Sequence, residues 1–195
     1  RGPEKVKSAS MQHSGRETVL QVGFPHPVCG LVVQATDRGV VAIEFADPQQ
    51  GSGTAEEWGK SPAYMHLEVA VDQLREYFAG LRRAFTVPID FTRAATPFRR
   101  RVVEALAQIP YGQTITYAQL AAAAGKPRAI RAAASACAQN PLPILYPCHR
   151  VTRSDGSIGE YRGGAELKQA LLAMERRAME RRAMEPVSYT HLTLP

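Results

Sequence analysis

The adjacent pair Cys148 and His149 combines a thiol nucleophile with an imidazole base in the segment 146–151, Tyr-Pro-Cys-His-Arg-Val. A catalytic thiol needs a lowered pKa, a basic partner and access to substrate. Pro147 disfavours helical geometry at the residue before it and so fixes the approach of the chain. Neighbouring side chains in an extended segment point apart, so a bridging water could carry the proton between them. The alternative interpretation is that Cys148 is a buried, inert cysteine, which is the commoner case for a single thiol.

Helices are expected to position this pair in the second half of the chain. Apolar spacing and turn residues predict three of them, over residues 98–106, 117–124 and 128–138. The last two are short and are joined by a tight turn at Gly125, which predicts a helix-turn-helix. The alanines of the third helix fit either packing on the core or close approach to a nucleic acid, with Arg131 projecting from it.

The first half has the pattern of a small sheet. Short β-branched runs at 18–24, 31–35 and 40–45 are separated by glycine, proline and aspartate, which predicts three adjacent antiparallel strands. Helical spacing of apolar residues follows over 64–81, and a further short strand is expected over 85–89.

These elements predict an α+β fold with two domains. We expect a flexible leader over residues 1–15, an N-terminal α/β domain over 16–92, a helix-turn-helix domain over 93–180 and an unstructured tail over 181–195.

Composition narrows the class of protein. The chain of 195 residues is 45% hydrophobic, which is enough for a core. It has no apolar run long enough to cross a bilayer and no secretion leader, so a location in the cytoplasm or nucleoid and no membrane partner are expected. Cys29, Cys137 and Cys148 lack the spacing of a disulfide framework or a zinc cluster, so no metal is expected.

Positive charge is concentrated in the second half. The net charge is +6 over the whole chain, −1 over residues 1–97 and +6 over residues 98–170. A polyanion such as DNA would dock there. Charge alone is weak support, because many solvated surfaces are basic.

A series of motifs between Thr96 and Glu175 resembles the catalytic domain of the O6-alkylguanine-DNA alkyltransferases, the methylated-DNA–protein-cysteine methyltransferases. The first ninety residues resemble the same proteins more loosely. They are similar to the C-terminal half of an Ada-type regulator. The resemblance implies an RNase H-like first domain, no cofactor, and a DNA repair protein that acts once. The motifs are Pro110-Tyr111-Gly112, Tyr117–Ala121, Gly125–Arg128, Ala129–Ala132, Asn140–Ile144, Pro147–Val151 and Gly159–Gly164.

Catalytic roles come with the resemblance. It implies that Cys148 accepts the alkyl group, that His149 is its general base through water, and that Glu175 orients the histidine. Asn140 matches the residue that ties down the turn ahead of the cysteine, and it also fits an ordinary helix C-cap.

The resemblance also implies a partner, duplex DNA carrying O6-alkylguanine, bound through its minor groove by a monomer. Arg131 matches the residue that fills the space of the flipped nucleotide, and Tyr117 matches the tyrosine that contacts the flipped guanine. The carbonyls of Cys148 and Val151 would accept from the exocyclic amine of guanine. Whether O4-alkylthymine is also a substrate is left open. The remaining substrate or DNA positions are Cys137, Tyr161, Arg162 and Lys168, and Arg162 replaces a serine of some family members.

Two other classes of protein compete with this interpretation. One is a non-catalytic DNA-binding module, but the family's non-catalytic relatives replace the cysteine and Cys148 is present. The other is a thiol hydrolase, which needs an oxyanion hole that the sequence does not reveal.

Overall fold

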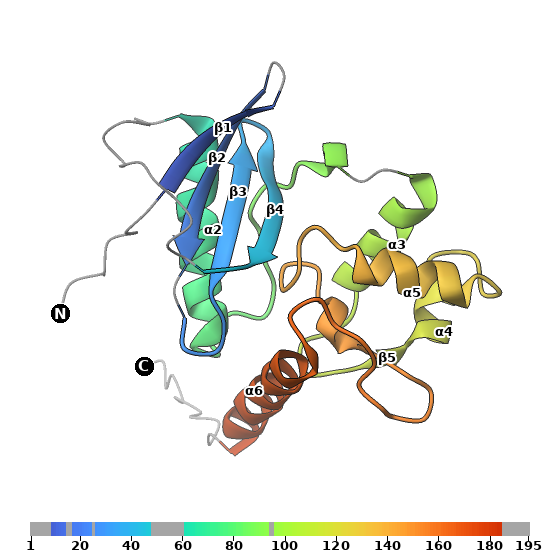
Figure 1. Cartoon of the computed structure of the whole chain (residues 1–195). Helices are drawn as coiled ribbons and strands as arrows, with labels where there is room; N and C mark the ends of the chain where they lie inside the picture. The colour runs from blue at the N-terminus through green and yellow to red at the C-terminus, as the bar shows by residue number, and fades with distance from the viewer. Residues whose placement is uncertain (1–8, 15–16, 25, 48–60, 94–95, 185–195) are drawn as a thin grey trace, which may run out of the picture.

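A computed structural model describes residues 9–14, 17–24, 26–47, 61–93 and 96–184. The first half forms one antiparallel sheet in the order β1-β2-β3-β4 (Figure 1). Its strands are β1 (Ala9–Ser14), β2 (Glu17–Phe24), β3 (Leu31–Thr36) and β4 (Gly39–Phe45). The last three are the predicted strands, each within one residue at either end.

Strand β1 differs from the prediction, because it lies in the segment expected to be a flexible leader. It pairs with β2 from Ala9 opposite Val22 to Ser14 opposite Glu17. Main-chain hydrogen bonds form an edge strand without apolar alternation, so its sequence carried no signal. The prediction of a strand over residues 85–89 is wrong. Of that segment only Ile89 pairs, in a single parallel bridge to Val40.

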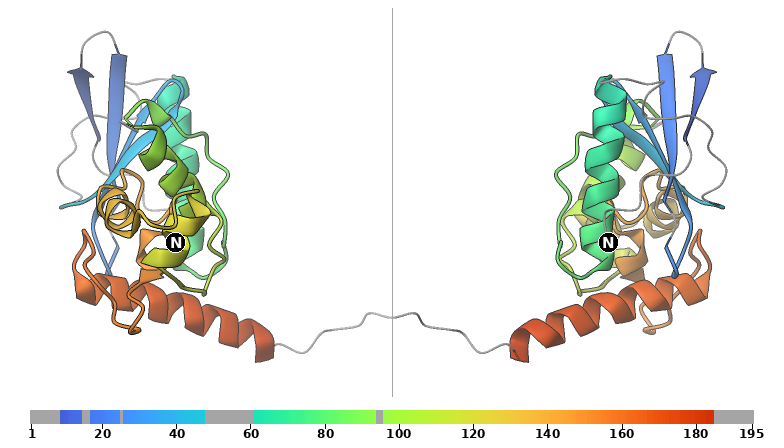
Figure 2. Two further views of the ribbon diagram at one scale, coloured as in Figure 1. Left: turned by 90° about the vertical axis from the view of Figure 1, so that its right-hand side faces the viewer. Right: turned by 90° about the vertical axis from the view of Figure 1, so that its left-hand side faces the viewer.

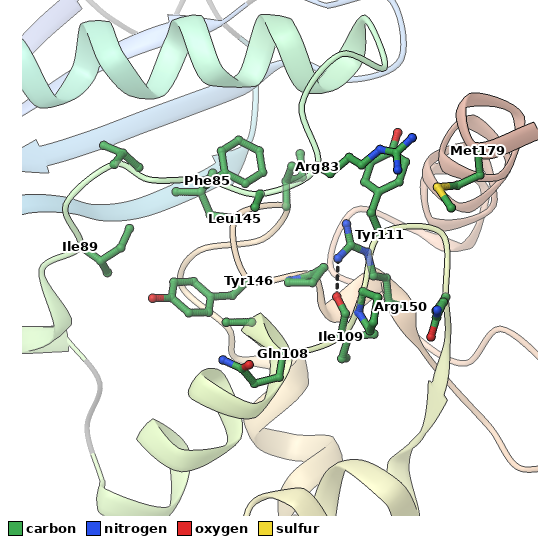
Figure 3. Close-up of a pocket in the computed structure, with 17 residues that line it drawn as sticks. Arg83, Phe85, Ile89, Gln108, Ile109, Tyr111, Leu145, Tyr146, Arg150 and Met179 are labelled. Atoms are coloured by element: carbon green, nitrogen blue, oxygen red, sulfur yellow. Dashed lines mark hydrogen bonds between the residues drawn. The ribbon is translucent and has the colours of Figure 1, made fainter. Parts of the chain in front are cut away.

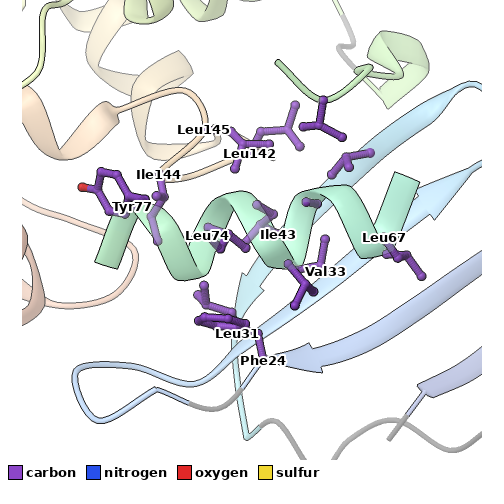
Figure 4. Close-up of a cluster of buried hydrophobic side chains, with 14 of the residues drawn as sticks. Phe24, Leu31, Val33, Ile43, Leu67, Leu74, Tyr77, Leu142, Ile144 and Leu145 are labelled. Atoms are coloured by element: carbon purple, nitrogen blue, oxygen red, sulfur yellow. The ribbon is translucent and has the colours of Figure 1, made fainter. Parts of the chain in front are cut away.

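Helix α2 (Pro62–Phe78) covers one face of this sheet. Ser61 caps it by accepting a 3.3 Å hydrogen bond from the Tyr64 amide, and Pro62 suits the first helical position. Figure 4 shows its buried face against the sheet and against a loop from the second half of the chain. That loop, which leads to Cys148, is thereby anchored in the first-half core through Leu142, Ile144 and Leu145.

The second half is mainly helical, as predicted. The turn between α4 (Tyr117–Ala123) and α5 (Ile130–Ala138) contains Gly125 at φ 77°, a left-handed conformation that favours glycine. Thr116 and Gln119 form a reciprocal capping box at the start of α4. The elements are η1 (Phe91–Arg93), α3 (Pro97–Ala107), β5 (Ile115–Thr116), α4 (Tyr117–Ala123), α5 (Ile130–Ala138), η2 (Cys148–Arg150), β6 (Val151–Thr152) and α6 (Ala165–Met184).

Helix α6 lies across one end of the molecule and extends beyond it (Figure 2). It reaches Met184, whereas the predicted tail began at residue 181. Its buried residues, Lys168, Leu171, Glu175 and Ala178, recur three or four positions apart and therefore share one face. No helix in the described ranges combines the length and apolar character that crossing a bilayer requires.

Candidate active site

Cys148 is the first residue of η2 and is 5% exposed. Hydrogen bonding to Cys137 is the largest cause that lowers the pKa of Cys148 below its ordinary value, and it acts against burial, which raises that pKa. Asn140 and the positive charge of Lys168 lower the pKa further. The thiol therefore has the electrostatic environment of a nucleophile.

His149 contacts α6 through its ring nitrogen Nε2. Its Nε2 lies 2.9 Å from Oε1 of Glu175, and both side chains are fully buried. Burial lowers the pKa of His149 below its ordinary value, although Glu175 acts in the opposite direction. The imidazole is therefore neutral at neutral pH and able to accept a proton.

Glu175 is held by groups from three other segments of the chain. Burial would raise its pKa, but hydrogen bonds from His149 and Arg150 outweigh it and lower the pKa to about 2. Arg150 donates from Nη2 to Oε1 at 2.8 Å and from Nε to Oε2 at 3.0 Å. The amide of Gly112 donates to Oε2 at 2.9 Å, and the Tyr77 hydroxyl donates to Oε1 at 2.6 Å. A buried carboxylate with this many donors is ionised and fixed in place.

This network also assigns the histidine tautomer. An ionised Glu175 only accepts hydrogen bonds, so Nε2 of His149 carries the hydrogen that faces it. Nδ1 then holds a free lone pair, and it has no hydrogen-bond partner among the described residues. The imidazole is thus oriented with its basic nitrogen available.

The loop ahead of Cys148 is tied down by Asn140. Its amide Nδ2 donates to the Tyr146 carbonyl at 2.7 Å, and its Oδ1 accepts from the Leu142 amide at 3.1 Å. Ile144 has φ 74°, which is rare for a β-branched residue and is held here by burial in the first-half core. Asn140 therefore closes the loop that delivers the thiol.

A small pocket adjoins the thiol, and we call it the Cys148 pocket. Its volume is about 10 Å³, room for about one water molecule. A purine base does not fit in this volume. The lining residues are Cys137, Ala138, Asn140, Pro143, Cys148, Glu160, Tyr161 and Arg162.

Two further predicted site residues, Lys168 and Tyr117, lie outside the lining of this pocket. Lys168 is buried, and its ammonium donates to the carbonyls of Val151 and Ile158, both at 2.5 Å. Tyr117 begins α4 and packs in the same apolar cluster as Cys148 and Val151. Burial is the largest cause that raises the pKa of Tyr117, to about 12. The Tyr117 phenol is therefore protonated at neutral pH, whereas burial lowers the pKa of Lys168 below its ordinary value.

Arg131 stands apart from this cluster, exposed on α5. Arg162 is also exposed, at the rim of the Cys148 pocket. Together with the exposed side chains of Arg100, Lys126 and Arg128, Arg131 gives the α3–α5 region a basic surface.

A larger cavity of about 490 Å³ lies behind the site, between the segment 83–89 and the second half (Figure 3). Cys148 does not line it, whereas Arg150 does, and Arg150 also donates to the Ile109 carbonyl at 2.7 Å. The Tyr111 ring lies within 6 Å of the guanidinium carbons of both Arg83 and Arg150. This cavity is therefore separate from the nucleophile, although it shares one wall with the Glu175 network. Within the described ranges, no three His, Cys, Asp or Glu side chains are grouped to hold a metal ion.

Sequence reasoning missed three residues of the Glu175 network. Tyr77 lies in the first domain, and its place on the apolar face of α2 suggested only a core residue. Arg150 adjoins His149, but nothing in the sequence indicated that it binds Glu175. Gly112 belongs to the Pro-Tyr-Gly motif, which signalled a turn and not an amide donor.

Two family models match the chain. The DNA binding domain of 6-O-methylguanine DNA methyltransferase matches residues 97–177, and its ribonuclease-like domain matches residues 26–91. These matches confirm the predicted fold class.

Known relatives agree with the family models. A methylated-DNA–protein-cysteine methyltransferase from Methanothermobacter thermautotrophicus is 37% identical over 150 residues, which cover 77% of this chain and 81% of that protein. The bifunctional transcriptional activator/DNA repair enzyme Ada of Escherichia coli is 39% identical over 182 residues. That match covers 87% of this chain but only 49% of Ada, so the chain spans about half of that relative.

A solved structure of Mycobacterium tuberculosis OGT in complex with DNA is also similar. Its TM-score is 0.68 at 31% sequence identity, and the match covers 80% of this chain and 92% of that one. With the Cys148 loop, the Glu175 network and the two matched domains in one chain, the protein belongs to the 6-O-methylguanine DNA methyltransferase family.

Proposed function

We propose that this protein repairs DNA by moving a methyl or other alkyl group from O6 of guanine to the sulfur of its own Cys148. The observation that carries the proposal is the buried arrangement of Cys148, neutral His149 and ionised Glu175. Its family membership and a solved relative in complex with DNA support DNA as the partner.

The reaction is an in-line displacement at the alkyl carbon. His149 takes the thiol proton at Nδ1 through a bridging water, and Glu175 stabilises the imidazolium that results. The thiolate attacks the alkyl carbon, a C–S bond forms, and the bond from that carbon to O6 breaks. The product is a thioether, which is not readily hydrolysed, so each chain reacts once.

Tyr117 is the proposed hydrogen-bond donor that contacts the flipped guanine and helps to neutralise it as the leaving group. A pKa of about 12 keeps its phenol protonated at neutral pH, as a donor must be. Lys168 fixes the Val151 carbonyl, which, with that of Cys148, would accept from the exocyclic amine of guanine. A carbonyl oxygen has two lone pairs, so the lysine leaves one for the base.

Entry of the base requires two movements. The lesion must leave the duplex, because O6 is enclosed in the stacked, paired base. Arg131 on the exposed basic surface of α5 would fill the vacated space from the minor groove, while Tyr161 and Arg162 move to open the Cys148 pocket. All these residues come from one chain, and we propose that it acts as a monomer on cytoplasmic or nucleoid DNA.

The test is the stoichiometry of methyl transfer from a duplex with one radiolabelled O6-methylguanine. We expect transfer of one methyl group per protein chain and none by Cys148→Ser. Repeated turnover would favour a hydrolase, and tight binding without transfer would favour a non-catalytic module.

A further inference from the structure

Cys137 is a buried thiol that the proposed alkyl transfer does not use as a nucleophile. It lies on α5, is 5% exposed, and lines the Cys148 pocket together with Cys148. Its Sγ donates a hydrogen bond to the Cys148 carbonyl at 3.9 Å. The second sulfur therefore lies against the residue that carries the first.

The two thiols are electrostatically unequal. Hydrogen bonding between the two thiol side chains lowers the pKa of Cys148 and raises the pKa of Cys137, and burial raises the pKa of Cys137 further. Cys148 therefore carries the greater share of thiolate, while Cys137 keeps its proton. Because oxidants attack the thiolate, Cys148 is the thiol that reacts first with a peroxide.

We propose that Cys137 is the resolving thiol for oxidised Cys148, so that the two form a reversible disulfide under peroxide. Hydrogen peroxide transfers one oxygen atom to the Cys148 sulfur, giving a sulfenic acid and releasing water. The Cys137 sulfur then attacks the Cys148 sulfur, the S–OH bond breaks, and a second water leaves as the disulfide forms. Two thiols are oxidised by two electrons, and one peroxide is reduced to two waters.

Cys29, the third cysteine, provides a contrast. It lines a different surface hollow, with Phe45 and Leu167, and burial raises its pKa to about 11. Cys29 does not line the Cys148 pocket, so its thiol is not placed to resolve Cys148. The pairing should be specific to Cys137.

The disulfide would spare the single-use nucleophile. A sulfenic acid without a resolving thiol is oxidised onward to sulfinic acid, which ordinary thiols do not reduce. A disulfide is returned to two thiols by a dithiol, and the alkyl acceptor is then restored. Alkylated Cys148 is a thioether, so the repaired chain cannot form this bond.

The experiment treats the full chain with hydrogen peroxide and maps its peptides without reduction. We expect a mass loss of about 2 Da, the two hydrogens lost in disulfide formation, and a cross-linked peptide pair joining Cys137 to Cys148. Methyl transfer should be lost and then return after dithiothreitol. Peptide mapping needs no DNA, so it detects or excludes the disulfide even if the protein fails to transfer an alkyl group.

Two variants and one pretreated sample complete the test. Cys137→Ala should gain about 32 Da on Cys148, the two oxygens of a sulfinic acid, and its transfer activity should not return with dithiothreitol. Cys29→Ser should behave as the wild type, and protein already methylated on Cys148 should keep a free Cys137. A disulfide that includes Cys29, or full recovery of oxidised Cys137→Ala, would overturn the proposal. So would oxidised wild type that carries sulfinic acid and no disulfide.

Discussion

The hydroxyl of Tyr77 donates a 2.6 Å hydrogen bond to the Glu175 carboxylate, although the two residues are 98 positions apart in the sequence. Tyr77 ends the buried face of α2 in the first domain, while Glu175 lies on α6 in the second. The same hydroxyl lies 3.3 Å from Nε2 of His149. The first domain thus completes the network that orients the proposed base.

Tyr77→Phe tests this link. The change leaves the ring in place and removes one buried donor to a charged group, so the free energy of unfolding should fall by about 2 kcal/mol. Alkyl transfer should also slow, because Glu175 and His149 are held less firmly. Urea unfolding and single-turnover rates measure the two effects.

Tyr64→Phe is the matched control, since Tyr64 lies on the same helix but outside the Glu175 network. It should change the free energy of unfolding by less than about 0.5 kcal/mol. Equal effects of the two substitutions on stability and rate would show that the Tyr77 hydroxyl has no special role.

Glu175→Gln tests the ionised state of the carboxylate. The pKa of Glu175 lies at about 2 in the folded protein, against about 4.3 when unfolded. A depressed folded pKa contributes stability above pH 4.3, and this contribution is lost as the pH falls toward 2. The loss amounts to about 3 kcal/mol and should be missing from the variant. Urea unfolding at several pH values measures it.

Glu104→Gln provides the comparison, because Glu104 forms an exposed ion pair with Arg100. The stability of the Glu104→Gln variant should depend on pH as that of the wild type does. If Glu175→Gln also kept the full acid dependence, the carboxylate would not be the group that titrates.

Gly112→Ala tests the turn that supplies an amide to Glu175. Gly112 has φ 75°, and an added Cβ would lie 2.9 Å from Cγ of Met179. Gly125 has φ 77° with nothing within 4 Å of the added atom, so Gly125→Ala isolates the backbone strain. We expect a cost of about 1 kcal/mol for Gly125→Ala and about 2 kcal/mol for Gly112→Ala.

Alkyl transfer should slow only in Gly112→Ala, because only Gly112 donates to Glu175. Thermal unfolding and single-turnover rates distinguish the two variants. A larger stability loss in Gly125→Ala would contradict the packing argument.

Arg131→Ala tests the proposed base flipping. Only a lesion in a duplex must leave the base stack, so the variant should lose repair of duplex DNA about tenfold or more while reacting normally with free O6-benzylguanine. Arg176→Ala on α6 removes the same charge away from α5 and should alter neither reaction strongly. The rates of both variants are measured with both substrates. If Arg131→Ala lost activity equally on duplex DNA and on O6-benzylguanine, Arg131 would not be the residue that assists base flipping.

Much of the fold could be predicted because its elements carry local signals. Strands β2 to β4 follow β-branched runs, and α4 and α5 are bounded by glycine and proline. Strand β1 was missed because its segment carries no apolar periodicity, whereas its pairing with β2 is made by the main chain. The two-residue strands β5 and β6 were missed because such short pairs form only after the surrounding chain has folded.

The residues of the candidate site likewise divide into those that the sequence indicated and those that it did not. Adjacency identified Cys148 and His149, and the family resemblance identified Glu175. Whether Glu175 reaches His149 depends on which face of α6 carries Glu175. The structure places Glu175 on the same buried face as Lys168 and Leu171. Tyr77 gave no signal, because a contact across 98 residues arises from the packing of the two domains.

The identity of the alkyl acceptor is the central claim, and peptide mass spectrometry after one reaction tests it most directly. The protein is incubated with a duplex that contains a single O6-methylguanine, digested and mapped. We predict an added mass of about 14 Da, one methylene, on the peptide that contains Cys148 and on no other. The same mass on Cys137 or Cys29, or an unmodified protein beside repaired DNA, would contradict the assignment of Cys148 as the acceptor.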